Sequence, residues 1–283
     1  MSTNTELQTV LRASHERLED ATRPLTDQEI AGPSYCKDWS TAQVLSHIGS
    51  GAQIFGLLLD AGLAGAETPG RDEMSKVWDV WNAMSPTEQA RNSLNADSEF
   101  LDRVAAVPAA ELDAMQMTLF GAPAGAARLL ELRLFEHAIH TWDVIVIRDP
   151  DAEVAGDAVA WMVDRLDPLA ARSGKTEAGP LEVDITTTDP DRAFRLSVTD
   201  VVKLVSAGAA DARPATATVR MPASALVRLV YGRLDTEHTP ATVEADGIDL
   251  DTLRSIFPVS EADRTTAGRP SPAGDRAQAW RPR

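Results

Sequence analysis

The alternation of apolar and polar residues divides the chain into a helical part and a part that contains strands. Over residues 1–172, apolar side chains recur every three or four positions, which is the spacing of an amphipathic helix. After residue 175, stretches such as 181–189 and 193–198 alternate apolar and polar side chains and are rich in β-branched residues, as strands are. The pattern therefore predicts a helical domain over 1–172, followed by a small α+β domain over 176–260.

Start signals in the first part predict where two of the helices begin. Ser40 stands just before a long apolar stripe and is suited to be an N-cap. Ser85 and Glu88 have the spacing of a capping box, with Pro86 between them at the first helical position. The longest uninterrupted helical pattern runs from about residue 125 to residue 147.

The second part has the pattern of four strands and two short helices. Residues 215–221 and 241–246 are the third and fourth predicted strands, and Pro222 begins a short helix between them. A closing helix is predicted over 247–257. Residues 261–283 are rich in Arg, Pro, Gly and Ala and have little to bury, so we predict a disordered tail there.

Composition excludes several classes of partner. The chain of 283 residues is 43% hydrophobic and 25% charged, which is typical of a globular protein. Its net charge of −16 disfavours nucleic acid and anionic membrane surfaces, because both require clustered cations. No signal peptide is evident and no apolar run approaches a membrane span of about 20 residues. Cys36 is the only cysteine, which fits a reducing cytoplasm, so we expect a cytoplasmic protein with no membrane partner.

The stretch LFEHAIHTWDV, residues 134–144, holds the first candidate for chemistry. On a helix, Glu136 and His140 are four residues apart, and His137 and His140 are three apart, so either pair can converge on a metal ion. Spacing alone does not choose between the pairs. The flanking apolar residues predict a buried helix, in which a glutamate or histidine must be paired or bind a ligand. The alternative is a solvated or internally paired face.

A further histidine, His47, lies in the apolar stretch VLSHIGS of the second predicted helix. Metal sites in helical bundles are built from side chains on facing helices. His47, Glu136 and His140 would together give two imidazoles and one carboxylate, which suits Zn²⁺ with an open fourth position. The alternative is a core histidine that hydrogen-bonds within the protein.

Two longer stretches resemble a known family. DWSTAQVLSHIGSGA, residues 38–52, together with ELRLFEHAIHTWDV, residues 131–144, resembles the DinB-like bundle of the mycothiol-dependent maleylpyruvate isomerase family. Residues 185–257 resemble the sterol-carrier-like α+β domain of the same family. The resemblance covers nearly all of residues 1–260. It implies an N-terminal four-helix bundle followed by a small α+β domain.

The resemblance also implies a set of metal ligands. Carried over, the ligands are His47, Glu136 and His140, and His137 is set apart from the metal. The metal in the family is usually zinc, and Ni²⁺ or Mn²⁺ are the alternatives that we consider.

Two more residues match positions of the family. Asp143, in the H-x-W-D pattern, is expected to orient a ligand or the substrate, the alternative being a solvated surface aspartate. Arg233 is expected to face the cleft and to bind a carboxylate of the cofactor or substrate, the alternative being an exposed arginine. Tyr231 and Phe194 stand where the family more often has tryptophan.

The implied function is a mycothiol-dependent reaction. Mycothiol is a small thiol of actinobacteria, and an excess of arginine over lysine is consistent with such a GC-rich source. As a metal-bound thiolate, it would attack a small electrophile, for example a carboxylic acid, in a cis–trans isomerisation or a thiol S-transfer. Both reactions would use the same residues, so the sequence does not separate them. We expect a monomer or weak dimer.

A function of another class is a non-catalytic module that keeps the fold and binds a small ligand or a protein. The presence of all three ligand types at the motif positions disfavours it. Among the remaining residues, His15 and His238 lie in polar segments and are expected to be exposed. Cys36 is expected to be a packed thiol with no histidine partner, and five tryptophans are expected to fill the core or the domain seam: Trp39, Trp78, Trp81, Trp142 and Trp161.

Overall fold

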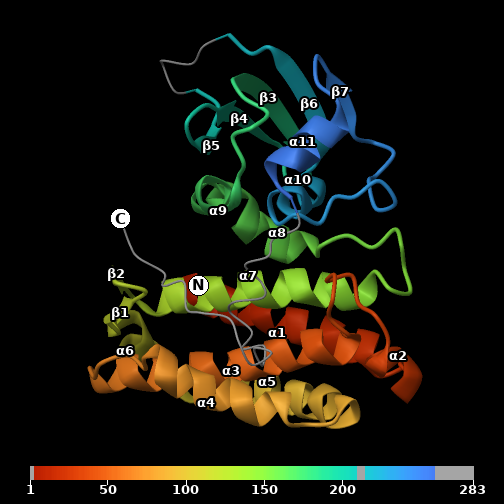
Figure 1. Cartoon of the computed structure of the whole chain (residues 1–283). Helices are drawn as coiled ribbons and strands as arrows, with labels where there is room; N and C mark the ends of the chain where they lie inside the picture. Colours follow the sequence, from red (N-terminus) through yellow and green to blue (C-terminus); the bar gives the residue numbers. More distant parts are fainter. Residues whose placement is uncertain (1–2, 209–213, 259–283) are drawn as a thin grey trace.

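The computed structural model describes residues 3–208 and 214–258. A helical bundle forms the N-terminal part, and a sheet with short helices follows it (Figure 1). The predicted fold class, a bundle followed by an α+β unit, is confirmed. The division into domains at residues 172–176 stays a prediction, and the predicted tail, 261–283, lies outside the described residues.

Within the described part of the chain, four helices have 20 residues or more. Helix α1 packs against α5 and α7, and α3 packs against the same two helices, so the four close into a bundle (Figure 1). Their bounds are α1 (Thr3–Thr22), α3 (Thr41–Ala64), α5 (Pro86–Ala106) and α7 (Ala126–Ile145).

The helix starts predicted from the sequence are confirmed. Ser40 accepts a hydrogen bond from the backbone N–H of Gln43, whose side chain in turn accepts from the N–H of Ser40. Ser85 and Glu88 form the same reciprocal pair at the start of α5. Each box satisfies backbone donors that have no partner inside the helix.

A short hairpin interrupts the otherwise helical N-terminal part, and a purely helical reading of 1–172 is wrong there. The hairpin turns at Phe120 and Gly121, whose φ angles of 50° and 83° suit a tight two-residue turn. Its strands have three residues each, too few for an alternating pattern to stand out in the sequence. The short elements of this part are α2 (Asp27–Ala31), α4 (Arg71–Asn82), α6 (Ala109–Ala114), β1 (Met117–Leu119) and β2 (Ala122–Ala124).

Three short helical segments lie between the bundle and the sheet (Figure 1). Helix α8 contacts α7 of the bundle and α10 of the second unit, and α9 packs against β5. These segments are α8 (Gly156–Met162), the 3₁₀ turn η1 (Val163–Arg165) and α9 (Asp167–Ser173).

The second unit is a five-stranded sheet of order β5-β4-β3-β6-β7. The central pair, β3 and β6, is parallel, and the other neighbours are antiparallel. The four predicted strands are present, and β5 was missed. The elements of the second unit are β3 (Leu181–Thr188), β4 (Arg192–Val198), β5 (Val202–Ser206), β6 (Ala217–Pro222), α10 (Ala223–Val230), β7 (Glu244–Asp246) and α11 (Leu250–Ile256).

One apolar cluster runs through both units, from Leu7 of α1 to Phe257 after α11. Helix α3 contributes heavily to it. By length and composition alone α3 could span a membrane, although no apolar run of that length was expected from the sequence. Within α3, however, 67% of the apolar 18-residue stretch that meets this criterion is buried inside the protein. Its position in the bundle core accounts for its apolar character.

Gly49 allows α3 to approach its neighbours closely. A β-carbon at Gly49 would lie 2.2 Å from a ring atom of Trp81 and 2.7 Å from the Cα of Ser93. The second contact involves backbone, so the helices themselves would have to move.

We therefore expect Gly49→Ala to lower the free energy of unfolding by about 1–3 kcal/mol, measured by urea denaturation. Gly156→Ala is the matched control, because no atom lies within 4 Å of the added methyl group there. Equal stability of the two variants would contradict the close approach.

Candidate metal centre

Three side chains from two helices converge on one point. His47 lies on α3, and Glu136 and His140 lie one turn apart on α7. The Nε2 atom of His47 is 3.3 Å from Oε2 of Glu136, and the Nε2 atom of His140 is 3.8 Å from the same oxygen. The two imidazole rings meet edge to face, with their centroids 4.6 Å apart.

These separations match those of metal ligands. Zinc bonds of 2.0–2.1 Å in a tetrahedral arrangement place neighbouring ligand atoms about 3.4 Å apart. One potential ligand atom from each of the three residues lies within 4.8 Å of the other two. The spacing of the sequence left two pairs possible, Glu136 with His140 and His137 with His140. The fold brings Glu136 and His140 together with His47, and His137 is not part of this cluster.

Asp143 orients His140. Its Oδ2 lies 2.8 Å from Nδ1 of His140, on the side of the ring opposite to the Nε2 atom that faces Glu136. A carboxylate at Nδ1 holds the proton there and leaves Nε2 to bind a metal, as in many histidine metal sites. Asp143 has no exposed surface, which excludes the alternative of a solvated aspartate.

Arg233 reaches Asp143 from the second unit. Its Nε and Nη2 atoms donate to the two carboxylate oxygens at 2.8 and 2.9 Å, a bidentate geometry. The side chain is 5% exposed, so the alternative of an exposed arginine is excluded. The carboxylate that Arg233 binds in this structure is that of Asp143, and its predicted role toward a substrate or cofactor stays a prediction.

Burial and pairing act against each other on the pKa values of these groups. Burial raises the pKa of Asp143, but the charge of Arg233 and the hydrogen bond from His140 lower it far below the usual range. Burial lowers the pKa of His140, but its hydrogen bonds to Asp143 and Cys36 raise it to about 10. In the metal-free protein His140 is therefore protonated at neutral pH, and a metal ion that binds its Nε2 must release a proton.

Glu136 forms the open side of the cluster. The expectation that it is buried is wrong, because its side chain is 47% exposed, whereas those of His47 and His140 are 13% and 2% exposed. Desolvation raises its pKa, but the hydrogen bond with His47 and the charges of both histidines lower it to about 2. An ionised carboxylate at the solvent edge leaves room for an exogenous ligand.

Trp39 packs beside both histidines. Its ring centroid lies 5.5 Å from that of His47 and 6.4 Å from that of His140, to which it is nearly parallel. The residue is buried, as expected, as are Trp81 and Trp142, while Trp78 and Trp161 are half-buried.

Comparison with known proteins agrees with this geometry. Residues 11–145 match the family model of the mycothiol maleylpyruvate isomerase N-terminal domain. The match includes all three residues of the cluster. The bundle is therefore similar to this family of isomerase N-terminal domains. The resemblance seen in the two sequence stretches is thereby confirmed.

Solved structures show that the likeness in fold extends beyond residues 11–145. A crystal structure of a mycothiol-dependent maleylpyruvate isomerase aligns with a TM-score of 0.64 and 13% identity, covering 88% of this chain and 95% of that one. A histidine-to-alanine mutant of such an isomerase aligns with a TM-score of 0.65, 14% identity and the same coverage. At this identity the likeness shows the fold alone. None of the curated proteins compared with the chain matches it in sequence.

Three residues lie in surroundings that the sequence did not predict. His15 is buried rather than exposed, and its Nδ1 lies 2.7 Å from Asp97 in the core of the bundle. His238 is also mostly buried, with its side chain 14% exposed, and it pairs with Asp235. Cys36 is packed as expected, but it does have a histidine neighbour, since it forms a compact group with His140 and Asp143. The contacts of His15 and Cys36 join segments far apart in the sequence, so no local spacing signals them, whereas the partner of His238 is only three residues away.

The buried pair of Asp143 and Arg233 gives a test of the geometry. We expect Asp143→Leu and Arg233→Met each to lower the free energy of unfolding of the metal-free protein by about 3–5 kcal/mol, because each leaves a buried charge unpaired. The double variant should lose less than the sum of the two, as measured by urea denaturation. Additive losses would show that the two groups do not interact.

Cys36 should be chemically unreactive in the folded protein. Burial and the negative charge of Asp143 raise the pKa of its thiol, and the opposing effects of His140 and Arg233 do not reverse this. At pH 8 we expect an aromatic disulfide reagent to modify the folded protein at least about tenfold more slowly than the urea-unfolded protein, followed by absorbance. Equal rates would indicate an accessible thiolate.

Proposed function

We propose that the chain is a metal-assisted, mycothiol-dependent enzyme that performs a cis–trans isomerisation or a thiol S-transfer on a small electrophile. One observation carries this proposal: two imidazole nitrogens and one carboxylate oxygen converge, with one side open to solvent. That arrangement is typical of catalytic rather than structural zinc sites. The family of the bundle supports mycothiol as the thiol.

The residues present fit a divalent metal ion. His47, Glu136 and His140 would hold it, with zinc the first choice and Ni²⁺ or Mn²⁺ the alternatives. When bound, such an ion would lower the pKa of a coordinating thiol, so that mycothiol reacts as the thiolate near neutral pH. For isomerisation, the thiolate would add to one alkene carbon and leave the electron pair on the neighbouring carbon. After rotation about the resulting single bond, that electron pair would expel the thiolate and restore the double bond.

The surrounding residues have distinct roles in this proposal. Asp143 fixes the tautomer and the direction of His140 through Nδ1. Arg233 neutralises Asp143 in a setting where an unpaired carboxylate would be costly. We further propose that Arg233, whose positive charge lowers the pKa of Glu136, assists in binding an anionic substrate or cofactor carboxylate.

Local charge favours an anionic substrate despite the net charge of −16. Glu136 and Asp143 each carry a charge of −1 and Arg233 a charge of +1, so the net charge of these three groups and the imidazoles is −1 when the imidazoles are neutral. A divalent ion would change this to +1. A small carboxylic acid is therefore attracted at short range although the surface as a whole repels it.

A second candidate function is a non-catalytic module that binds a small ligand or protein. The compact group of Cys36, His140 and Asp143 shows that His140 is firmly paired even in the absence of metal. A fold that has lost its metal would retain this pairing. The proximity of Glu136 and His47 on the other side of the ring favours the enzyme.

Metal content and mycothiol turnover test the proposal. Protein purified without a chelator or a metal-binding tag should contain close to one divalent ion per chain, by plasma emission spectrometry. His47→Ala should lose the ion but keep the circular dichroism of the folded protein. His238→Gln is the matched control, since it removes a histidine outside the cluster and should retain the ion.

With mycothiol and a panel of electrophiles that includes maleylpyruvate, the wild type should turn over at least one substrate, and His47→Ala should lose at least about 100-fold in rate. Wild-type protein without metal would overturn the enzyme assignment, and metal retained in His47→Ala would overturn the ligand set. A metal-loaded protein that consumes or isomerises none of the panel would favour the binding module.

A further inference from the structure

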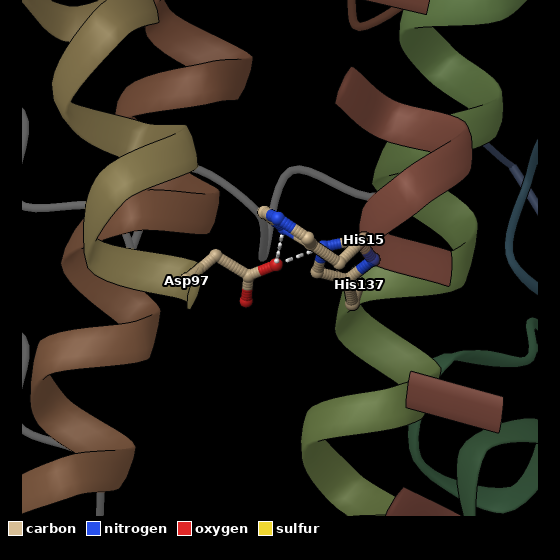
Figure 2. Close-up of side chains that lie close together, drawn as sticks. All are labelled: His15, Asp97 and His137. Atoms are coloured by element: carbon tan, nitrogen blue, oxygen red, sulfur yellow. Dashed lines mark hydrogen bonds and ion pairs between the residues drawn. The ribbon is translucent and has the colours of Figure 1, made fainter. Parts of the chain in front are cut away.

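A second cluster of two histidines and one carboxylate lies deeper in the bundle. Figure 2 shows His15 of α1 and His137 of α7 directed at the carboxylate of Asp97 on α5. Nδ1 of His15 and Nε2 of His137 lie 2.7 and 2.9 Å from the same oxygen, Oδ2. The side chains of Asp97 and His137 are 1% and 0% exposed.

The surroundings of this cluster distinguish it from the cluster of His47, Glu136 and His140. An ionised carboxylate only accepts hydrogen bonds, so both imidazoles direct N–H groups at Asp97. Nη2 of Arg133 donates to the other oxygen, Oδ1, at 2.5 Å. The charges of Asp97 and Arg133 already cancel, so a divalent ion would add an uncompensated charge of +2 to the core.

The remaining nitrogen of His137 is also committed. Its Nδ1 lies 2.8 Å from the hydroxyl of Ser14 on α1 and 3.1 Å from that of Thr141 on α7. With Nε2 donating to Asp97, Nδ1 of His137 is the ring nitrogen that accepts from these hydroxyls. Asp97 therefore ties α5 to α1 and α7 through a network of buried hydrogen bonds.

This network and the metal cluster share one helix. Arg133, His137 and Thr141 follow one another at intervals of four on α7, and so do Glu136 and His140. Adjacent positions such as 136 and 137 are about 100° apart around the helix axis. The rotation of α7 that satisfies the network on one face therefore sets the direction of the two ligands on the next face.

We propose that Asp97 is a positioning residue for the metal centre: by binding His137 and Arg133, it fixes the rotation of α7 that directs Glu136 and His140 at His47. This inference rests on the proposed function. A side-chain atom about 5 Å from the helix axis moves about 1.7 Å when the helix turns by 20°. Metal sites tolerate deviations of only about 0.2 Å in ligand distance.

The test uses metal affinity and the spectrum of the Co²⁺-substituted protein. In Asp97→Asn we expect zinc affinity to fall about 10–100-fold and the visible Co²⁺ bands to shift or weaken. Val104→Ala is the matched control, a core truncation on the same helix with no polar contact. It should lower stability while leaving both affinity and spectrum unchanged.

His15→Ala keeps the experiment decisive if Asp97→Asn does not fold, because it removes one donor at the edge of the network, where the side chain is 11% exposed. We expect His15→Ala to lower the zinc affinity and to shift the Co²⁺ bands less than Asp97→Asn does. Wild-type zinc affinity and a wild-type Co²⁺ spectrum in folded Asp97→Asn and His15→Ala would overturn the inference. It would also be overturned if the wild type bound two metal ions per chain and His15→Ala bound only one. Equal effects of Val104→Ala and Asp97→Asn would also overturn it. A wild type that binds no metal would instead overturn the proposed function.

Discussion

Helix α7 brings polar side chains into an apolar core, and each of them must find a partner there. Arg133, His137, His140, Thr141 and Asp143 are all buried on this one helix. An unpaired buried polar group costs several kcal/mol, so the partners are as much a requirement of folding as of function. They come from α1, α5, the segment before α3 and the second unit, and this demand fixes how those elements surround α7.

The bundle contains two sets of two histidines and one carboxylate, and their surroundings give them different chemistry. At Asp97, both imidazoles and an arginine already use the carboxylate, and the group is closed to solvent. At Glu136, the carboxylate is half open to solvent. The histidine His140 has its other nitrogen held by Asp143, which leaves Nε2 directed at the cluster. Donor type alone therefore does not define a metal site.

The second unit takes part in the candidate centre although it provides none of the three proposed ligands. Arg233 binds Asp143, which binds His140, so a chain of charged hydrogen bonds leads from the α+β unit to a proposed ligand. Arg228 lies nearby, with its guanidinium 5.1 Å from the ring centroid of Trp142. The docking of the sheet unit on α7 and the order of the centre are thus coupled by the same buried contacts.

The sequence by itself determined the helix starts at Ser40 and Ser85 and most strands, because these depend on local spacing and capping. Its spacing left open whether Glu136 or His137 pairs with His140. It missed β5 and the β1–β2 hairpin, whose strands are stabilised by pairing and are too short for a clear pattern. Only the tertiary structure decided that Glu136 is open and His15 buried, and that Arg233 meets Asp143. These outcomes depend on contacts between residues 82 to 90 positions apart, which tertiary packing creates and spacing does not encode.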